Sequence, residues 1–395
     1  MKFFQKLLLA PAALGLLAPL AANANESNFR DVTNYSQDQV EVSLDTFKPL
    51  SSKNPLLAGG EGASQAQSNN FDEDSFSSTT TAAFTSNFAI GKEEGGSTEE
   101  YIANFDYEIA LTSSFTGSDS LDVVMQAGQS AGYTELDMTN NSKVVTVDSI
   151  TYTTSLGDKV STFVAFGDSA AGSTLYNTAC VYGAQADTFS NCGVANANID
   201  EGLGTALGAS FDFGNGVSAA VGYEGQGGTT NGFAGKEGLD ALGFQVAYTG
   251  DSYGVSVSYA NIQKDSGVTG APHISNQSVG FNAYFAPDLG NFPSISAGIE
   301  STILDDSPSV TDANDKQSHY FVGLQWDEIG NGTLGAAMGS KAPYAENADA
   351  LTMYEVFYSY NYADGITLTP LIYSKDNSGS TADETGVILK STFSF

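Results

Sequence analysis

The residues that could do chemistry are acidic, and several of them gather around the two cysteines in one long segment. Cys180 and Cys192 lie close together within residues 169–204, as expected of one disulfide in an oxidising compartment. A bridge around so short a segment stabilises it by on the order of 3 kcal/mol through loop-closure entropy. The carboxylates predicted to line this segment are Asp187, Asp200 and Glu201.

Enzymatic chemistry finds little support. His273 and His319 are the only histidines; they lack the spacing of a metal pair, and neither lies beside a nucleophile motif. The glycine-rich stretch 225–228 does not open a predicted helix, so it is weak evidence for a phosphate cradle. We therefore expect no catalytic residue, no cofactor and no metal site, although fold class alone does not exclude an enzyme.

The charge balance restricts the partners. The chain has 46 Asp and Glu against 14 Lys and Arg, a net charge of −32, and no basic patch that could meet phosphate. This excludes nucleic acid as an expected partner. Only 15% of residues are charged, while Gly (43), Phe (24) and Tyr (19) are abundant. Such a composition is typical of a chain that faces lipid on one side and a polar lumen on the other.

The last ten residues, 386–395, form a predicted strand with two different sides. Its polar side includes Lys390, and its apolar side ends the chain. In an outer-membrane β-barrel, lipid-facing residues of a strand must be apolar at every second position. We expect the apolar side to face lipid and to serve as the signal for the barrel-assembly machinery. Its residues are Val387, Leu389, Phe393 and Phe395.

The other end of the chain predicts export. Residues 1–24 have the basic start, apolar stretch and small-x-small ending of a signal peptide, and its removal takes the net charge from −32 to −34. Residues 25–75 are polar without lasting periodicity, which predicts a flexible periplasmic arm. No later apolar run reaches the roughly 18 residues of a membrane helix. An exported membrane protein without helical spans must be a closed barrel.

Residues 76–395 alternate between apolar and polar positions, with tight turns such as Asn215-Gly216 and Asp364-Gly365. The pattern predicts an all-β, antiparallel transmembrane barrel of about sixteen strands. Short and long connections alternate, and an even number of strands returns both barrel ends to the periplasmic side. A large soluble sandwich is the competing interpretation; the terminal Phe row and the alternation of loops argue against it. The predicted strands are 76–90, 102–115, 120–129, 145–156, 159–168, 205–213, 217–225, 240–249, 253–262, 276–286, 293–301, 317–326, 332–340, 352–362, 366–374 and 386–395.

Short motifs at both ends resemble one family. Residues 28–36 (Asn-Phe-Arg-Asp-Val-Thr-Asn-Tyr-Ser) and 76–80 (Phe-Ser-Ser-Thr-Thr) are similar to those of cyanobacterial outer-membrane porins, particularly those of marine picocyanobacteria. The resemblance implies diffusion of small hydrophilic solutes, carbohydrates among them, and of inorganic ions, with iron uptake described for several relatives. Many members carry a surface-layer-homology module before the barrel. The stretch after Ser36 has no room for it, so peptidoglycan attachment is not expected.

A pore acts through its narrowest ring. The segment 169–204 would be the third external loop, which folds inward in sixteen-stranded porins, so we expect it to form the constriction; a surface staple without effect on conductance is the alternative. On the wall, charged residues of the polar side are expected to line the pore: Asp106, Glu108, Glu355 and Lys390. Their acidic surplus predicts weak cation preference, unless most acid sits on the external rim.

These observations predict an outer-membrane porin that works by passive diffusion. Analogy with barrels of this size suggests a homotrimer. A structural or adhesive barrel with a blocked lumen is the alternative, and single-channel recordings would separate the two.

Overall fold

The computed structural model describes residues 80–95, 100–130, 132–227, 234–235, 238–266, 273–305, 316–345, 348–378 and 382–395. The predicted signal peptide and periplasmic arm, residues 1–75, lie outside the described residues. Among the described residues, no helix is long and apolar enough to cross a membrane.

Strands are the main secondary structure of the described chain. Two short 3-10 helices, η3 (Gly172–Leu175) and η4 (Asp187–Gly193), interrupt them. The strands are β1 (Thr80–Glu94), β2 (Ile102–Ser113), β3 (Asp119–Gln129), β4 (Thr146–Leu156), β5 (Val160–Phe166), β6 (Thr205–Gly214), β7 (Val217–Gly225), β8 (Asp240–Thr249), β9 (Tyr253–Lys264), β10 (Ile274–Phe285), β11 (Ser294–Ile303), β12 (Lys316–Trp326), β13 (Gly332–Ser340), β14 (Tyr344–Ala345), β15 (Thr352–Ala363), β16 (Ile366–Lys375) and β17 (Glu384–Ser394).

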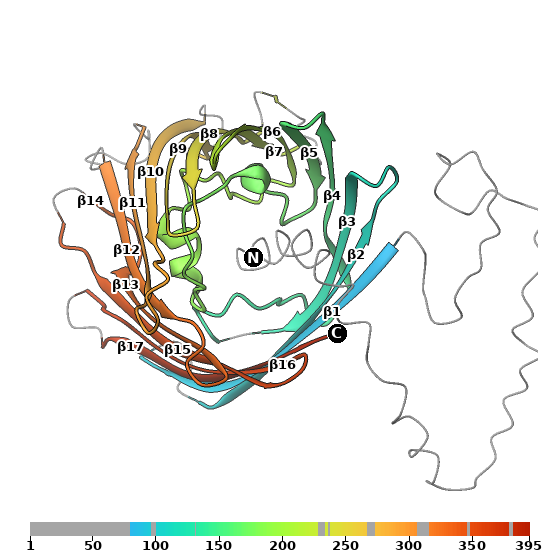
Figure 1. Cartoon of the computed structure of the whole chain (residues 1–395). Helices are drawn as coiled ribbons and strands as arrows, with labels where there is room; N and C mark the ends of the chain where they lie inside the picture. Colours follow the sequence, from blue (N-terminus) through green and yellow to red (C-terminus); the bar gives the residue numbers. More distant parts are fainter. Residues whose placement is uncertain are drawn as a thin grey trace, which may run out of the picture. The chain divides into compact units, whose positions relative to one another are not determined.

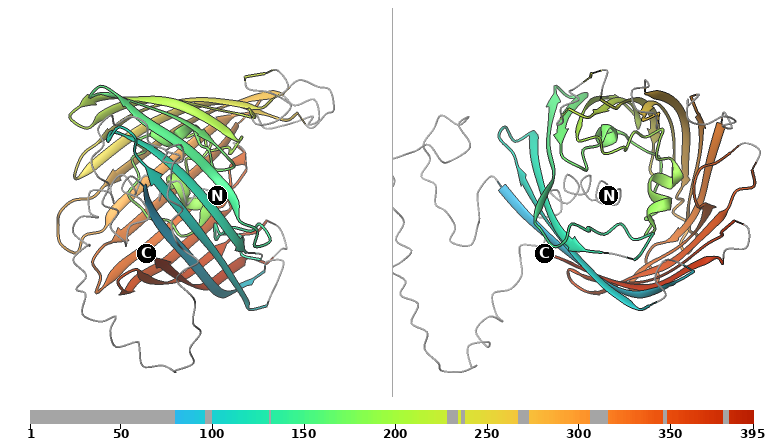
Figure 2. Two further views of the ribbon diagram at one scale, coloured as in Figure 1. Left: turned by 90° about the vertical axis from the view of Figure 1, so that its right-hand side faces the viewer. Right: turned by 180° about the vertical axis from the view of Figure 1, so that it is seen from behind.

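Each strand pairs antiparallel with its neighbours in sequence, and β1 pairs with β17 to close the wall (Figure 1). The two-residue β14 pairs with β12 beyond the end of β13, so it continues the place of β13 in the wall. The wall is therefore a closed barrel of sixteen antiparallel strands, and the predicted fold class is confirmed. Figure 2 shows the strands tilted across the wall, as closure of a barrel requires.

The observed strand boundaries agree closely with the sequence pattern except in the first strand. It was predicted at 76–90, whereas β1 continues to Glu94, which pairs with Thr385 of β17. Lys92 and Glu93 resemble loop residues in sequence. Glu93 is nevertheless buried on the inner side, where Tyr373 donates a hydrogen bond to its carboxylate. A polar partner inside the barrel thus extends the strand past the point where apolar alternation stops.

The tight turns have the backbone that their residues favour. Asn215 and Gly216 both have positive φ, at 54° and 80°, between β6 and β7. A two-residue hairpin of type I′ requires positive φ at both central positions, and Asn-Gly is the pair that tolerates it best. The register of these two strands is therefore set locally.

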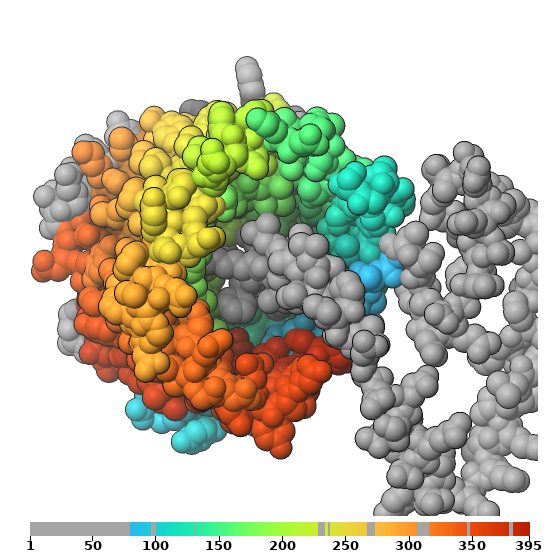
Figure 3. All heavy atoms as spheres, in the orientation of Figure 1, coloured from blue at the N-terminus to red at the C-terminus, as the bar shows by residue number. Residues whose placement is uncertain are grey.

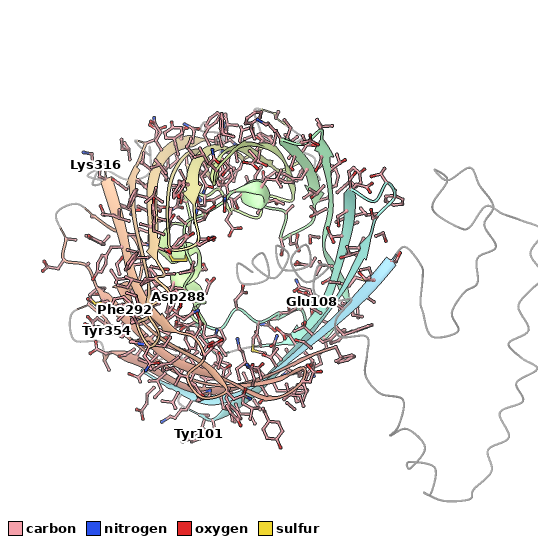
Figure 4. All side chains as sticks on the ribbon, viewed as in Figure 1. Tyr101, Glu108, Asp288, Phe292, Lys316 and Tyr354 are labelled. Atoms are coloured by element: carbon pink, nitrogen blue, oxygen red, sulfur yellow. A yellow bond between two sulfur atoms is a disulfide. The ribbon has the colours of Figure 1, made fainter. Side chains whose placement is uncertain are left out.

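The two faces of the wall differ in chemistry. Apolar side chains along the strands point outward and are exposed, including Val257, Val279 and Ile299. Tyr101 and Tyr354 likewise lie on the outer side (Figure 4). Polar side chains such as Ser256, Ser278 and Glu300 alternate with them and are buried toward the inside. The wall is thus inverted relative to a soluble protein, with its apolar face outermost.

The predicted apolar side of the last strand lies on this outer face. Val387 and Leu389 are exposed, and Phe395 is 81% exposed. Phe395 stacks on Phe84 of β1 with 5.4 Å between ring centroids, and Phe393 meets Phe88 edge-on at 5.7 Å. The aromatic row thus covers the seam between β17 and β1 from outside.

Candidate functional site

A long loop connects β5 to β6 and lies inside the barrel. Residues 167–204, here called the long inward loop, carry η3 and η4 along the inner wall (Figures 1 and 2). Figure 3 shows the coloured atoms of wall and loops surrounding a hollow at the end of the barrel. The candidate site is therefore the inner surface formed by this loop and the strands behind it.

The extended part of the loop, residues 177–186, is fastened to the wall through its backbone. Alternate N–H groups donate to side chains of successive strands, in order around the barrel. Asn177 donates to Gln245 of β8 at 2.6 Å, Ala179 to Ser256 of β9 at 3.0 Å, Val181 and Tyr182 to Ser296 of β11 at 3.1 Å, Gly183 to Gln325 of β12 at 2.8 Å, and Gln185 and Ala186 to Glu355 of β15. Three of these residues, Ala179, Tyr182 and Ala186, are buried, and buried backbone donors need such acceptors.

Three carboxylates of the wall also bind the loop, two of them outside its extended part. Glu224 of β7 accepts from the Gly172 N–H at 2.7 Å, and Glu300 of β11 accepts from the Ala197 N–H at 2.8 Å. Glu355, 1% exposed, also accepts from the Tyr182 hydroxyl at 2.8 Å. Burial, with the Glu355 carboxylate beside it, raises the pKa of Tyr182 far above its usual range, so the hydroxyl remains a donor. Charge-assisted hydrogen bonds of this kind are among the strongest available to a loop.

Glycines of the inner wall let the loop approach closely. A Cβ added to Gly222 of β7 would overlap the Gly172 carbonyl oxygen, and one added to Gly298 of β11 would overlap the Cys192 carbonyl oxygen. Four further glycines on β8, β10, β12 and β13 lie against loop side chains. They are Gly243, Gly280, Gly323 and Gly339. Glycine is the residue that permits such backbone approach.

Cys180 and Cys192 form the predicted disulfide, with 6.0 Å between their Cα atoms. It joins the extended part of the loop to the end of η4. Asn191 and Cys192 adopt left-handed backbone, and the Asn191 carbonyl accepts from Asn282 Nδ2 of β10 at 3.1 Å. The bridge therefore fixes two arms of the loop against neighbouring strands.

An apolar cluster holds the loop from beneath. Phe321 of β12 and Phe357 of β15 point inward and are buried. The rings of Tyr182 and Phe189 lie 5.3 and 5.1 Å from the Phe321 ring. Aromatic pairs at this spacing add to the stabilisation gained from burial alone.

Sequence reasoning missed both this cluster and the backbone acceptors. The sequence does hold a signal for the cluster, which is two consecutive apolar residues within an otherwise alternating strand. Because successive residues point to opposite faces, such a pair makes the inner face apolar as well as the outer one. These pairs are Phe321-Val322, Val356-Phe357, Leu371-Ile372 and Ile388-Leu389.

Two predicted pore-lining carboxylates, Asp106 and Glu355, lie on the inner face but under loop backbone. Asp106 accepts from Asn87 Nδ2 at 2.9 Å and from the Thr139 N–H at 3.0 Å. Both carboxylates are 1% exposed, so in this structure they anchor loops.

The remaining predicted residues are divided between loop and wall. Glu201 forms an ion pair with Lys264, while Asp187 and Asp200 are half-buried in the loop. Glu108 is buried on the inner face of β2 (Figure 4), and its Oε2 has no hydrogen-bond partner among the described residues. Lys390 is half-buried on the inner face of β17 and interacts electrostatically with Asp106 and Glu355.

Comparison with known proteins shows which solved structures share this fold. No family model and no curated protein matches the sequence. Solved structures do match. OprB of Pseudomonas putida has a TM-score of 0.57 at 12% identity over 80% of this chain and 94% of that one. An anion-selective porin from Comamonas acidovorans has a TM-score of 0.56 at 13% identity over 80% and 99%.

OmpF of Salmonella typhi, in complex with daunomycin, has a TM-score of 0.54 at 11% identity over 80% of this chain and 97% of that one. The chain has the fold of a bacterial porin. At these identities the likeness concerns the barrel architecture alone.

Proposed function

We propose that the protein is an outer-membrane porin through which small hydrophilic solutes and inorganic ions diffuse passively. The observation that carries this proposal is the inverted wall, with apolar side chains exposed outside and polar side chains and a long loop inside. Hydrocarbon can solvate the outer face, and a closed wall leaves no strand edge unpaired in lipid. The solute gradient supplies the driving force, so the function requires no cofactor.

The girdles expected at a membrane surface support the same proposal. Aromatic side chains lie at the turn ends of the wall, where Tyr253 and Phe285 are paired across β9 and β10 and exposed, and where Phe395 follows β17. At the opposite end, Tyr354 is exposed near the start of β15. Aromatic residues concentrate at both interfaces of membrane barrels.

The finer identity rests on the sequence resemblance. The motifs at residues 28–36 and 76–80 support membership of the cyanobacterial porins. Carbohydrates, inorganic ions and iron are then the candidate cargoes. A homotrimer and insertion by the barrel-assembly machinery through the apolar side of β17 belong to the same proposal. The amino-terminal arm would then lie in the periplasm.

We assign the constriction to the long inward loop. Its fastening to β7, β8, β9, β11, β12 and β15 supports a fixed narrowing rather than a mobile plug. The Cys180–Cys192 bridge would hold its shape, so Cys180→Ser is expected to change conductance and ion selectivity. Unchanged values in a folded variant would leave the bridge as a staple without a role in permeation.

The proposed preference is for cations. The sequence has no arginine after Arg30, and two lysines near the inner surface, Lys264 and Lys375, are paired with glutamates. A third lysine, Lys390, lies on the inner face of β17. The inner face of β2 and β4 carries three carboxylates, those of Asp106, Glu108 and Asp148, and Glu108 interacts electrostatically with the other two. Carboxylates without a cationic cluster opposite them attract cations, as acidic rings do in cation channels.

Liposome swelling tests the diffusion function. Vesicles containing the purified protein should swell in a series of uncharged sugars, at rates that fall as sugar size rises. Absence of swelling for every sugar, together with silence in bilayer recordings, would favour the structural or adhesive barrel with a blocked lumen.

A further inference from the structure

A second loop, which connects β3 to β4, also lies along the inner wall. Its described residues 132–145 are here called the short inward loop. The Tyr133 hydroxyl donates to the Ile102 carbonyl at 2.7 Å, and Asn141 Nδ2 donates to the Gln126 carbonyl at 3.1 Å. Burial raises the pKa of Tyr133 to about 12, which keeps this donor protonated. With the Thr139 contact to Asp106, the loop follows β3, β2 and β1 along the inside (Figure 1).

The two inward loops share one apolar core. Leu136 and Met138 of the short loop are buried in the same cluster as Phe189 and Tyr182 of the long loop. The wall contributes Ile388 of β17 to this cluster, together with residues of β12, β15 and β16. The loops therefore pack as one body rather than as two independent segments.

Glu135 joins the two loops to the wall. Its Oε1 lies 3.1 Å from Lys375 Nζ of β16, and its Oε2 accepts from the Thr188 N–H at 3.2 Å. Its backbone carbonyl accepts from the Asp187 N–H at 2.9 Å. Burial raises the pKa of Glu135, and the Lys375 ammonium opposes that rise and favours the charged form. One side chain thus bridges the short loop, the long loop and β16.

The barrel closes next to Glu135, where β1 pairs with β17. Thr134 donates through its N–H to Glu93 of β1 at 3.0 Å and through its hydroxyl to Glu384 of β17 at 2.6 Å. Lys375 Nζ lies 2.5 Å from Glu384 Oε1. The contacts of Glu135 therefore lie next to the seam where β1 pairs with β17.

Between them, the two loops contact every strand of the wall. The long loop contacts β4 to β13 and β15, and the short loop contacts β1, β2, β3, β16 and β17. We propose that the loops form a single collar whose aperture sets the conductance, and that Glu135 is the positioning residue that holds its two arcs together. The proposal rests on the porin function and adds a second constriction element to it.

Loss of the Glu135 carboxylate should loosen the contact between the arcs, which would still be joined by the Asp187 N–H bond to the Glu135 carbonyl and by the shared apolar core. Thr188 would lose its acceptor, while Lys375 would keep Glu384 and the seam would stay closed. The long loop would remain tied to its other strands, so the barrel should fold. The aperture, however, should widen and fluctuate.

The test uses the full mature chain in planar bilayers. Glu135→Ala should roughly double the single-channel conductance and raise the open-channel noise, because the narrowest ring governs the current. Polymer exclusion should shift to larger polyethylene glycols in the same variant. Glu94→Ala is the matched control, since Glu94 is exposed near the same rim and its carboxylate, within the part of the chain that the structure describes, pairs with the neighbouring Lys92; it should behave as the wild type.

Heat-modifiable migration on gels establishes that each variant is folded. Should Glu135→Ala fail to fold, Glu135→Gln keeps an acceptor oxygen for Thr188 but loses the charge opposite Lys375, and a smaller rise in noise and conductance is expected. Folded variants with wild-type conductance, noise and polymer exclusion would overturn the collar while leaving the porin function intact. A wild type that conducts no current would instead overturn the porin function, and the collar with it.

Discussion

Glu355 illustrates how individual side chains position the candidate constriction. Its carboxylate faces the inside of β15 and accepts hydrogen bonds from the Tyr182 hydroxyl and from two backbone N–H groups of the long inward loop. A carboxylate suits this place because both of its oxygens accept and its charge strengthens each bond. Smaller or apolar side chains would leave these donors buried without partners. The acid therefore acts through the loop that it holds.

Glu355→Ala should destabilise the barrel by about 1–3 kcal/mol for each donor left without a partner. Equilibrium unfolding in detergent, followed by tryptophan fluorescence, measures this loss. Glu355→Gln keeps an acceptor oxygen and should lose less. Equal stability of the Ala variant and the wild type would show that the loop does not depend on this anchor.

At the scale of elements, the fit between loop and wall depends on strands that carry glycine where the loop crosses them. Gly298 of β11 lies against the Cys192 carbonyl, and no side chain could occupy that space without moving the loop. The disulfide limits how far Cys192 can retreat, since its partner Cys180 belongs to the extended part of the loop. Wall and loop are thus matched in shape as well as in hydrogen bonding.

Gly298→Ala should therefore cost about 1–3 kcal/mol through overpacking and should alter the conductance. Gly183→Ala provides the control, because a Cβ there meets only Gln325 Oε1 at an ordinary 3.4 Å. Thermal unfolding and single-channel recording of both variants make the comparison. Wild-type behaviour of Gly298→Ala would mean that the loop is not seated as described.

The sequence predicted the elements better than their inner contacts, and the reason is physical. Strand periodicity and turns such as Asn215-Gly216 are local, so the wall could be derived from short windows of residues. The contact of Tyr182 with Ser296 joins residues 114 positions apart, and no local pattern encodes it. Alternation put Asp106 and Glu355 on the polar side of their strands, and in the structure loop backbone covers both carboxylates. Alternation reveals the face of a residue but not what lies against it.

At the scale of the whole barrel, the outer face decides which solvent the protein needs. Val257 of β9 is 50% exposed, and its cross-strand neighbours Phe281 of β10 and Val246 of β8 are exposed as well. In water such a surface would associate, whereas in a bilayer it is the stable arrangement. The exposed apolar belt therefore links the fold directly to its proposed location.

Val257→Lys should lower the unfolding free energy in lipid vesicles by roughly 2–4 kcal/mol, the cost of a lysine near the middle of a bilayer. Val257→Ile is the control and should change little. In a water-soluble barrel, a lysine at an exposed position would instead be nearly neutral. Urea titration in vesicles distinguishes these two results.

We propose that the protein forms a water-filled channel through a wall solvated by lipid. Current recording in a planar bilayer under asymmetric potassium chloride tests for this channel. We expect discrete conductance steps with a reversal potential that shows a modest preference for potassium. Purified, folded protein that inserts without producing steps would contradict the channel itself. Steps with a reversal potential favouring chloride would contradict the charge assignment inside it.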